Sequence, residues 1–370
     1  MKTLIITLEY PPQVGGIASY VNNLASHLPA QETFVYAPKM KGDALYDGKN
    51  GWRVFRMKPY FSFFWPRWIR MYWQVRKIVK RQKIGRLMIQ HVLPAGYIGF
   101  LIMKSMKVPY YIFMHGSDLE VGLKKKRRKL SMVCRYAEKV IVSSIFLKNK
   151  LLSRIDDLKN VSVVYPAPGD NFLAEVDQSI IAETKAQLAL QGKKVIITVS
   201  RLAEGKGFPH LIRLLPQILK RVPNAAWLII GDGQKKQEII DLVQKNNLQN
   251  VVRFLGQIEN ELLPLYYHLA DLFVLLTHRD ETAEEGWGTV FMEAAACGLP
   301  VVAGSVGGVD EAVENLVTGL LVDTYQDTQV VSAVAELLLK SDYARQMGRA
   351  GRERVLQDFT WEKQAAKITQ

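Results

Sequence analysis

The chain has 370 residues and a formal net charge of +14, with 48% hydrophobic residues and two cysteines. This length predicts two domains, and the apolar fraction excludes a globally disordered chain. Two cysteines exclude a disulfide framework or a four-thiolate zinc site, so we expect a protein of the reducing cytoplasm. We expect no signal peptide, because Glu9 and two prolines interrupt the first apolar run, and no membrane span, which needs roughly 20 apolar residues.

Short β-type runs alternate with helical patterns along the whole chain. Strands separated by helices imply right-handed crossovers and parallel sheets that are covered on both faces. The predicted fold class is therefore α/β, with two doubly wound domains whose strand ends face a shared cleft. The predicted strands are Thr3–Leu8, Thr33–Tyr36, Leu87–Gln90, Tyr110–Met114, Val140–Val142, Val161–Val164, Val195–Val199, Ala226–Ile230, Val251–Phe254, Leu272–Leu275 and Val301–Ala303.

The best candidate for a linker between the two domains is Tyr165–Asp170, which contains two prolines and a glycine. Proline disfavours helix at the residue before it and cannot continue one. We therefore expect an N-terminal domain at residues 1–168 and a C-terminal domain at residues 169–356.

The positive charge belongs to the first half of the chain. Residues 1–165 carry a net charge of +20, whereas the remainder carries −6. Eleven basic residues and no acidic residue fall between Trp52 and Arg86, together with four of the seven tryptophans. A second basic cluster occupies Lys124–Lys129.

Basic residues interleaved with aromatic rings suit an anionic membrane surface, where each cation contributes about 1 kcal/mol. The apolar spacing between Trp65 and Lys83 predicts an amphipathic helix. We expect peripheral contact with the inner face of the cell membrane. Two alternatives remain: a core helix with a basic solvated face, and a nucleic-acid surface, which no accompanying motif supports. The predicted membrane contacts are Trp65, Arg67, Trp68 and Arg70.

Three glycine-containing or charged motifs follow predicted strands. Gly15 and Gly16 lie between the first strand and a helical pattern, where backbone N–H groups can approach an anion. The spacing G-x-G-x-x-G that favours NAD is absent, and a plain glycine turn is the alternative. Arg201 and Lys206 flank a loop that leads into a helix, an arrangement suited to a diphosphate, with simple surface charge as the alternative.

The third motif runs from Glu285 to Glu293. Glycines open this segment, and an apolar helix follows from about Thr289 until Gly298. The first N–H groups of that helix can bind an anion, and the two carboxylates can accept hydrogen bonds from sugar hydroxyls. Since a glutamate within an apolar helix is costly unless it is satisfied, Glu293 is a candidate binding residue.

Together with His115-Gly116-Ser117-Asp118, these motifs occur in the order seen in family 4 of the retaining, nucleotide-sugar-dependent glycosyltransferases. The chain resembles that family over nearly its whole length, most strongly from Ile196 to Val322. Two segments, Gly15–Tyr20 and Pro300–Gly304, resemble the phosphatidylinositol mannosyltransferases, which use GDP-mannose. The resemblance implies the GT-B fold, with a C-terminal helix at about 357–370 that packs on the first domain and buries Trp361.

The resemblance also implies roles for individual residues. Arg201 and Lys206 would bind the donor diphosphate, Glu285 the transferred sugar and Glu293 the ribose. His115 would lie beside the donor sugar. Further donor contacts implied by the motifs are Gly15, Gly16, Gly288, Thr289, Val290 and Ile258.

The predicted function is transfer of a hexose, of mannose or glucose type, from GDP-mannose or a UDP-hexose to a glycan or lipid-linked acceptor. The resemblance implies retention at the anomeric carbon, and we expect no metal and no other cofactor. The interdomain turn Pro168-Gly169-Asp170-Asn171 departs from the Asn-Gly-Val-Asp of many relatives, which puts an acceptor contact there in doubt. Two rival functions remain: a nucleotide-sugar epimerase or glycosidic phosphorylase, and a non-enzymatic basic membrane- or RNA-binding module.

Overall fold

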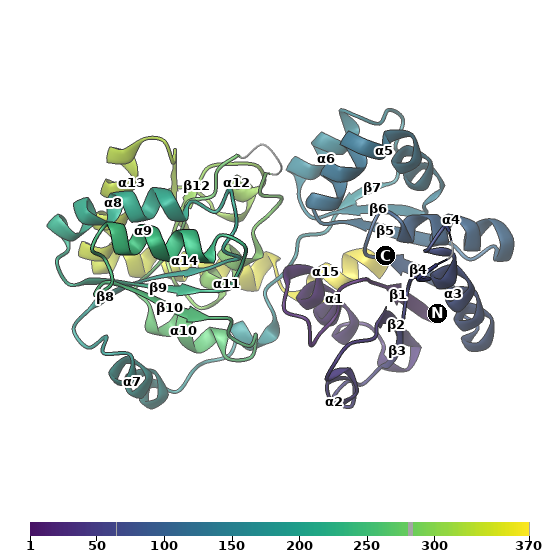
Figure 1. Cartoon of the computed structure of the whole chain (residues 1–370), viewed down its shortest axis with the longest axis horizontal. Helices are drawn as coiled ribbons and strands as arrows, with labels where there is room; N and C mark the ends of the chain where they lie inside the picture. Colours follow the sequence, from purple (N-terminus) through teal and green to yellow (C-terminus); the bar gives the residue numbers. More distant parts are fainter. Residues whose placement is uncertain (64, 280–283, 370) are drawn as a thin grey trace. The chain divides into compact units, whose positions relative to one another are not determined.

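A computed structural model describes residues 1–63, 65–279 and 284–369, without the side chains of Ser117, Asp118 and Lys125. The chain divides into two compact units (Figure 1). The N-terminal unit comprises Met1–Pro166 and Trp361–Gln370, and the C-terminal unit comprises Ala167–Thr360. Among the described residues, no helix has both the length and the apolar character needed to cross a bilayer.

The described part of the N-terminal unit forms a 7-stranded parallel sheet in the order β3-β2-β1-β4-β5-β6-β7. Its central strands are short apolar runs that are buried, as expected where helices cover both faces. The strands are β1 (Thr3–Ile6), β2 (Thr33–Pro38), β3 (Arg53–Met57), β4 (Arg86–Ile89), β5 (Tyr110–Met114), β6 (Lys139–Val142) and β7 (Val161–Val163).

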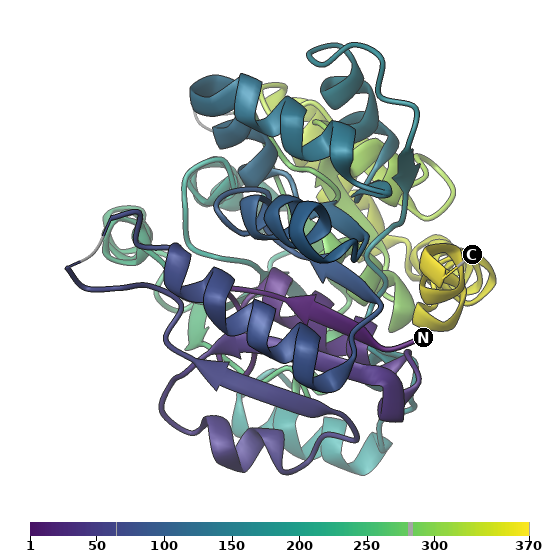
Figure 2. The same cartoon turned by 90° about the vertical axis from the view of Figure 1, so that its right-hand side faces the viewer.

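Helices connect these strands, and the last helix of the chain belongs to the same unit. Trp361, at the start of that helix, is 1% exposed and packs edge-on against Tyr20, with ring centroids 4.9 Å apart. Figure 2 looks onto this unit and shows the segment ahead of α3 extending outward as a loop. The helices are α1 (Gly16–Ser26), α2 (Asp43–Asp47), α3 (Ile69–Gln82), α4 (Ala95–Met106), α5 (Ser117–Tyr136), α6 (Ile145–Leu152) and α15 (Trp361–Thr369), with a 3₁₀ turn at Ala30–Glu32.

The described part of the C-terminal unit forms a 6-stranded parallel sheet in the order β10-β9-β8-β11-β12-β13. The strands are β8 (Lys194–Val199), β9 (Ala225–Ile230), β10 (Val252–Gly256), β11 (Leu272–Leu275), β12 (Val301–Gly304) and β13 (Gly319–Val322). The helices are α7 (Gln178–Gln187), α8 (Phe208–Arg221), α9 (Lys236–Lys245), α10 (Leu263–Leu269), α11 (Thr289–Ala296), α12 (Val309–Ala312), α13 (Asp327–Leu339) and α14 (Ser341–Asp358), with a 3₁₀ turn at Asp170–Phe172.

The predicted α/β class and the parallel sheets are confirmed, and every predicted strand is present within a few residues of its predicted bounds. Two further strands, β3 and β13, were not predicted. Both lie at the edge of their sheet. The sequence of β3, Arg-Val-Phe-Arg-Met, contains two arginines, and the strand is exposed or half-buried along its length, as an edge strand can be; β13 has only four residues.

The amphipathic helix predicted from Trp65 to Lys83 begins later, at Ile69. Its buried face consists of Met71, Val75, Ile78 and Val79, and Trp68 and Tyr72 pack against the same core, whereas Trp65 is exposed. The basic side chains occupy the opposite face, and the tryptophans at 65 and 68 lie ahead of the helix.

Candidate functional site

The C-terminal sheet has a topological switch point between β8 and β11, the two central neighbours from which the strand order runs outward in opposite directions. In open α/β sheets, ligands bind at the carboxyl ends of the strands at such a point. The loop after β8 carries Arg201 and Lys206, and the segment after β11 carries Glu285. The fold therefore brings together two of the motifs that the sequence analysis singled out.

Lys206 and Glu285 form an ion pair across this switch point. The Lys206 Nζ donates to Glu285 Oε2 at 2.5 Å, and the two side chains are 20% and 18% exposed. Burial raises the pKa of Glu285, but the charge and hydrogen bond of Lys206 outweigh it, helped by the charge of Arg201 and the Gly286 amide. The pKa of Glu285 therefore falls below its ordinary value, and its carboxylate is held ionised next to two cations.

Two close backbone contacts hold this ion pair in place. Gly207 has φ of +73°, and a Cβ there would lie 2.0 Å from the carbonyl oxygen of Leu276. Gly307 has φ of +64°, and a Cβ there would lie 2.2 Å from the carbonyl oxygen of Glu285. Gly308 N–H donates to that same carbonyl at 2.9 Å. Only glycine allows these approaches, so the loops after β8 and β12 seat Lys206 and Glu285 respectively.

Helix α11 begins at Thr289, four residues after Glu285. Gly288 is its N-terminal flanking residue, and Thr289 and Val290 form its first turn. The first N–H groups of a helix have no carbonyl partner within the helix, and the helix dipole favours negative charge there. The ion pair and this helix start are therefore a suitable environment for a phosphate group.

Glu293 lies on α11 and accepts a hydrogen bond from the hydroxyl of Tyr267, with the oxygens 3.0 Å apart. Burial raises the pKa of Glu293 to about 7, and the hydrogen bond from Tyr267 opposes that rise only in part. The sequence analysis did not identify Tyr267, which is fully buried on α10. In the sequence, Tyr267 is marked only as a tyrosine within an apolar run, and that pattern does not indicate a contact with Glu293.

Two other predicted donor contacts of this unit, Arg201 and Ile258, follow the carboxyl ends of β8 and β10 in the same sheet. Arg201 is exposed, and its charge acts on Glu285. Ile258 is half-buried and follows β10, at the edge of the sheet. No described contact links Ile258 to the ion pair.

The N-terminal sheet has its own switch point between β1 and β4. His115, directly after β5, shares a hydrogen bond with Gln90 after β4, with Nε2 and Oε1 3.1 Å apart. The neighbouring His91 lies 3.4 Å from the Thr7 hydroxyl after β1. Burial lowers the pKa of His115 to about 3, aided by His91, whose own pKa burial lowers to about 4. Both imidazoles are therefore neutral at physiological pH and can act as hydrogen-bonding groups.

Gly15 and Gly16 lie between β1 and α1 in the N-terminal unit. No described atom lies within 4 Å of where a Cβ of Gly16 would stand, and Gly16 is not among the described glycines with positive φ. Neither packing nor backbone conformation within the described residues therefore requires a glycine at position 16. Open space above the backbone is what a closely approaching ligand needs.

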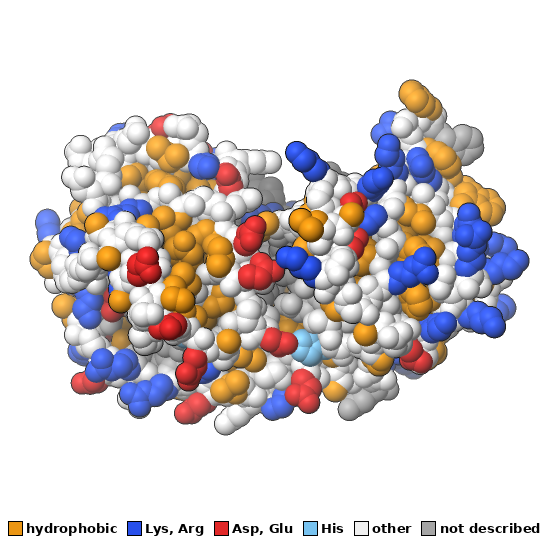
Figure 3. All heavy atoms as spheres, turned by 90° about the horizontal axis from the view of Figure 1, so that it is seen from below, with side chains coloured by type: hydrophobic (Ala, Val, Ile, Leu, Met, Phe, Trp, Pro, Cys, Tyr) orange, Lys and Arg blue, Asp and Glu red, His pale blue; other side chains and the backbone are white. Residues whose placement is uncertain are grey.

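The predicted membrane contacts differ in exposure. Trp65 is 84% exposed and Arg67 is exposed, whereas Trp68 is half-buried and stacks on Tyr97 with ring centroids 5.6 Å apart. Arg70 lies over the ring of Phe61 at 5.4 Å. Figure 3 shows Lys and Arg side chains crowding one face of the N-terminal unit, with hydrophobic groups between them.

Among the described residues, no group of three or more His, Cys, Asp or Glu side chains is placed to hold a metal ion. The sheets, the switch-point ion pair and the helix start beside it define a two-unit α/β protein whose C-terminal sheet has an edge suited to a phosphate group. Residues 180–354 match the family described as glycosyl transferases group 1, and residues 14–167 match Glycosyltransferase Family 4. With the full-length relatives described next, these matches show that the chain belongs to glycosyltransferase family 4.

The chain is 31% identical to the GDP-mannose-dependent alpha-(1-6)-phosphatidylinositol monomannoside mannosyltransferase of Mycobacterium tuberculosis, over 99% of this chain and 97% of that protein. It is 30% identical to the protein of the same name from Mycolicibacterium smegmatis, over the same shares. The solved structure of Anabaena HepE with UDP and glucose is similar in fold, with a TM-score of 0.84 and 20% identity, over 100% of this chain and 98% of that one.

Sucrose-phosphate synthase from Thermosynechococcus elongatus is similar to the same degree, with a TM-score of 0.82 and 22% identity, over 100% of this chain and 97% of that one. The predicted GT-B fold is therefore confirmed. Family membership also makes the chain an enzyme, a hexosyltransferase that uses a nucleotide-sugar donor. The epimerase, phosphorylase and non-enzymatic alternatives are not supported.

Proposed function

We propose that this enzyme transfers a mannosyl residue from GDP-mannose to a hydroxyl group of a lipid-linked glycan, with retention at the anomeric carbon. Full-length relatives at 31% and 30% identity carry names that specify GDP-mannose and a phosphatidylinositol monomannoside. The proposal rests on the Lys206–Glu285 pair, which stands beside a helix start at the switch point of the C-terminal sheet.

The donor diphosphate is proposed to bind Lys206, Arg201 and the first N–H groups of α11, at Thr289 and Val290. Cations and helix N–H groups stabilise the negative charge that builds on a departing diphosphate. On binding, the phosphate oxygens compete with Glu285 for the Lys206 ammonium. Glu285 is then free to accept hydrogen bonds from hydroxyl groups of the transferred sugar.

Glu293 is proposed to hold the ribose hydroxyls, since a carboxylate can accept from two vicinal hydroxyls. In the N-terminal unit, Gly15 and Gly16 are proposed to approach the donor closely, and the neutral His115 to hydrogen-bond the donor sugar. Gly288 is proposed to lie near the phosphate groups of the donor, and Ile258 near its base.

The reaction breaks the bond between the anomeric carbon and the diphosphate oxygen and forms one between that carbon and the acceptor oxygen. The acceptor loses its proton to the leaving phosphate oxygen on the same face of the sugar. This route requires no nucleophile from the protein, and neutralisation of the leaving diphosphate by Lys206 and Arg201 favours its departure.

A lipid-linked acceptor requires that the enzyme reach a membrane surface, which we propose it does through the loop ahead of α3 and the basic face of that helix. The exposed large side chains described there include Tyr60, Phe63, Trp65 and Trp73, with Phe63 fully exposed. Arg67, Arg76, Lys77 and Lys80 are exposed around them. Aromatic rings at headgroup depth combined with cations are typical of peripheral proteins on anionic bilayers.

The donor can be identified with purified protein. Thermal unfolding is measured with GDP-mannose, UDP-glucose and ADP-glucose, since a ligand at 100 times its Kd stabilises by about 2.7 kcal/mol. GDP-mannose is expected to produce the largest shift, followed by transfer of labelled mannose to a phosphatidylinositol mannoside in vesicles. A larger shift with a UDP-sugar would overturn the GDP-mannose assignment, and no shift with any donor would overturn the proposal.

A further inference from the structure

The segment that leads from β1 to the Gly15–Gly16 turn contains Pro11 and Pro12. Proline has no backbone N–H, so this part of the segment cannot donate hydrogen bonds to the rest of the protein. One amide follows at Gln13, and it bonds back to the carbonyl of Tyr10 at 3.2 Å. The segment must therefore be held through its carbonyl oxygens and its side chains.

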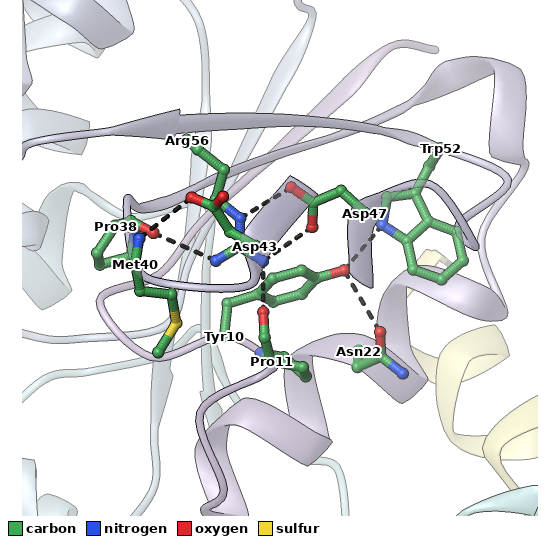
Figure 4. Close-up of polar contacts among 9 residues, drawn as sticks. All are labelled: Tyr10, Pro11, Asn22, Pro38, Met40, Asp43, Asp47, Trp52 and Arg56. Carbon is green, nitrogen blue, oxygen red and sulfur yellow. Dashed lines mark hydrogen bonds and ion pairs between the residues drawn. The ribbon is translucent and has the colours of Figure 1, made fainter. Parts of the chain in front are cut away.

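Arg56 supplies a donor for one of these carbonyls. It projects from β3, and its Nη2 donates to the carbonyl oxygen of Pro11, while Nη1 donates to the carbonyl of Pro38 at 3.2 Å (Figure 4). The same guanidinium forms a two-point ion pair with Asp47 of α2, with contacts of 2.9 Å from Nε and 2.8 Å from Nη2. Thus one side chain joins β3, α2, the end of β2 and the proline segment.

This ion pair is largely shielded from water, because Arg56 is 9% and Asp47 is 18% exposed. A carboxylate that pairs with a shielded guanidinium offsets part of the cost of burying its charge, while the planar fork leaves N–H groups directed elsewhere. Asp47 therefore orients the guanidinium, and the remaining N–H groups bind the two carbonyls. Lysine, with a single charged nitrogen, could not make all of these contacts.

Tyr10 extends the same network to helix α1. Its ring is fully buried and lies under the Arg56 guanidinium at 5.0 Å. Its hydroxyl accepts from Trp52 Nε1 at 3.0 Å and donates to Asn22 Oδ1 on α1 at 3.4 Å. Figure 4 shows these contacts on both sides of the proline segment. The network thus holds the chain just before the Gly15–Gly16 turn and the helix just after it.

We propose that Arg56 is a positioning residue for the Gly15–Gly16 turn, acting through the Pro11 carbonyl and held by Asp47. This inference rests on the proposed function, in which that turn approaches the nucleotide-sugar donor. Loss of the guanidinium frees the proline segment, so the turn samples many conformations and only a fraction of them accepts the donor. The KM for the donor rises in inverse proportion to that fraction.

The test compares Arg56→Met with Arg53→Met, which makes the same change on the same strand. Arg53 is exposed and lies over the ring of Phe55 at 5.0 Å. Two quantities are measured in the full-length enzyme: hydrogen–deuterium exchange of the amides at residues 13–17, and the separate values of kcat and donor KM. A purely structural loss would reduce the active fraction and hence apparent kcat, but would leave the donor KM of the remaining enzyme unchanged.

Arg56→Met is expected to speed exchange at residues 13–17 about tenfold and to raise donor KM about tenfold, whereas Arg53→Met changes neither. If Arg56→Met does not fold, Asp47→Asn tests the same point, because it keeps the guanidinium but removes its anchor; about a threefold change in both quantities is expected. Unchanged exchange, or faster exchange with an unchanged donor KM, overturns the inference.

Failure of the proposed function is recognised separately. Lys206→Ala is measured in the same assay, and wild-type donor kinetics in that variant would overturn the donor site itself. In that case the proposed positioning role of Arg56 would also be rejected, whatever exchange rates are measured for Arg56→Met.

Discussion

The hydroxyl of Tyr267 donates a hydrogen bond to Oε2 of Glu293 at 3.0 Å, and Tyr267 is fully buried whereas Glu293 is half-buried. Burial raises the pKa of Glu293 to about 7 from its ordinary value of 4.5. In the unfolded chain this carboxyl ionises near pH 4.5, whereas in the folded enzyme it retains its proton to about pH 7.

Glu293 therefore makes the stability of the enzyme depend on pH. Below pH 4.5 the carboxyl is protonated in both states, so its raised pKa does not change the free energy of unfolding. As pH rises from 4.5 to about 7, the free energy of unfolding falls by about 3 kcal/mol, and above that pH it stays at the lower value. Glu293→Gln should remove this dependence. Urea unfolding from pH 4 to 8 measures the difference between variant and wild type. A difference that does not grow with pH would show that folding does not raise the pKa of Glu293 above its ordinary value.

The Lys206→Ala variant tests the switch-point ion pair. Loss of one group that stabilises developing charge typically lowers kcat by about 100- to 1000-fold. The matched control is Lys340→Ala, because Lys340 pairs with Glu336 in an exposed position on the same unit. We expect initial rates of transfer to fall only for Lys206→Ala. Equal rates for the two variants would remove Lys206 from the donor site.

Gly16 and Gly307 should respond differently to the same substitution. At Gly307, with φ of +64°, a Cβ would lie 2.2 Å from the Glu285 carbonyl oxygen, so Gly307→Ala should cost at least about 1–3 kcal/mol of stability. At Gly16 the Cβ meets open space at the start of α1, so Gly16→Ala should leave the melting temperature unchanged or slightly higher.

The proposed function adds a kinetic expectation for the same pair. Gly16→Ala should raise donor KM because the new methyl group occupies the space that the ligand needs. Calorimetry and steady-state kinetics on both variants make the comparison. A stable Gly16→Ala enzyme with wild-type donor KM would exclude close approach of the donor at this turn.

Substitutions at Trp65 and Trp68 should distinguish a role in membrane contact from a role in packing. Trp65→Ala combined with Arg67→Glu should weaken sedimentation with phosphatidylglycerol vesicles, since each cation at the surface contributes about 1 kcal/mol, and added salt should weaken it further. Trp68→Ala should instead lower stability by about 1–3 kcal/mol, because Trp68 stacks on Tyr97. Wild-type sedimentation of the Trp65/Arg67 variant would refute the membrane surface.

The sequence by itself determined the alternation of strands and helices, because buried parallel strands require short continuous apolar runs that are visible locally. It also placed Arg201, Lys206, Glu285 and Glu293 in motifs next to strand ends. It did not predict β3, since that edge strand carries arginines, and it started helix α3 four residues too early.

Only the tertiary structure decided which of these residues meet. Lys206 and Glu285 are 79 positions apart and pair because β8 and β11 are neighbours in the sheet. Tyr267, the partner of Glu293, lies in an apolar run, and Pro11, the partner of Arg56, lies in a proline pair. Neither local sequence indicates which distant residue it contacts. Strand order is set by packing of the whole sheet, so contacts across it cannot be read from the periodicity of any one segment.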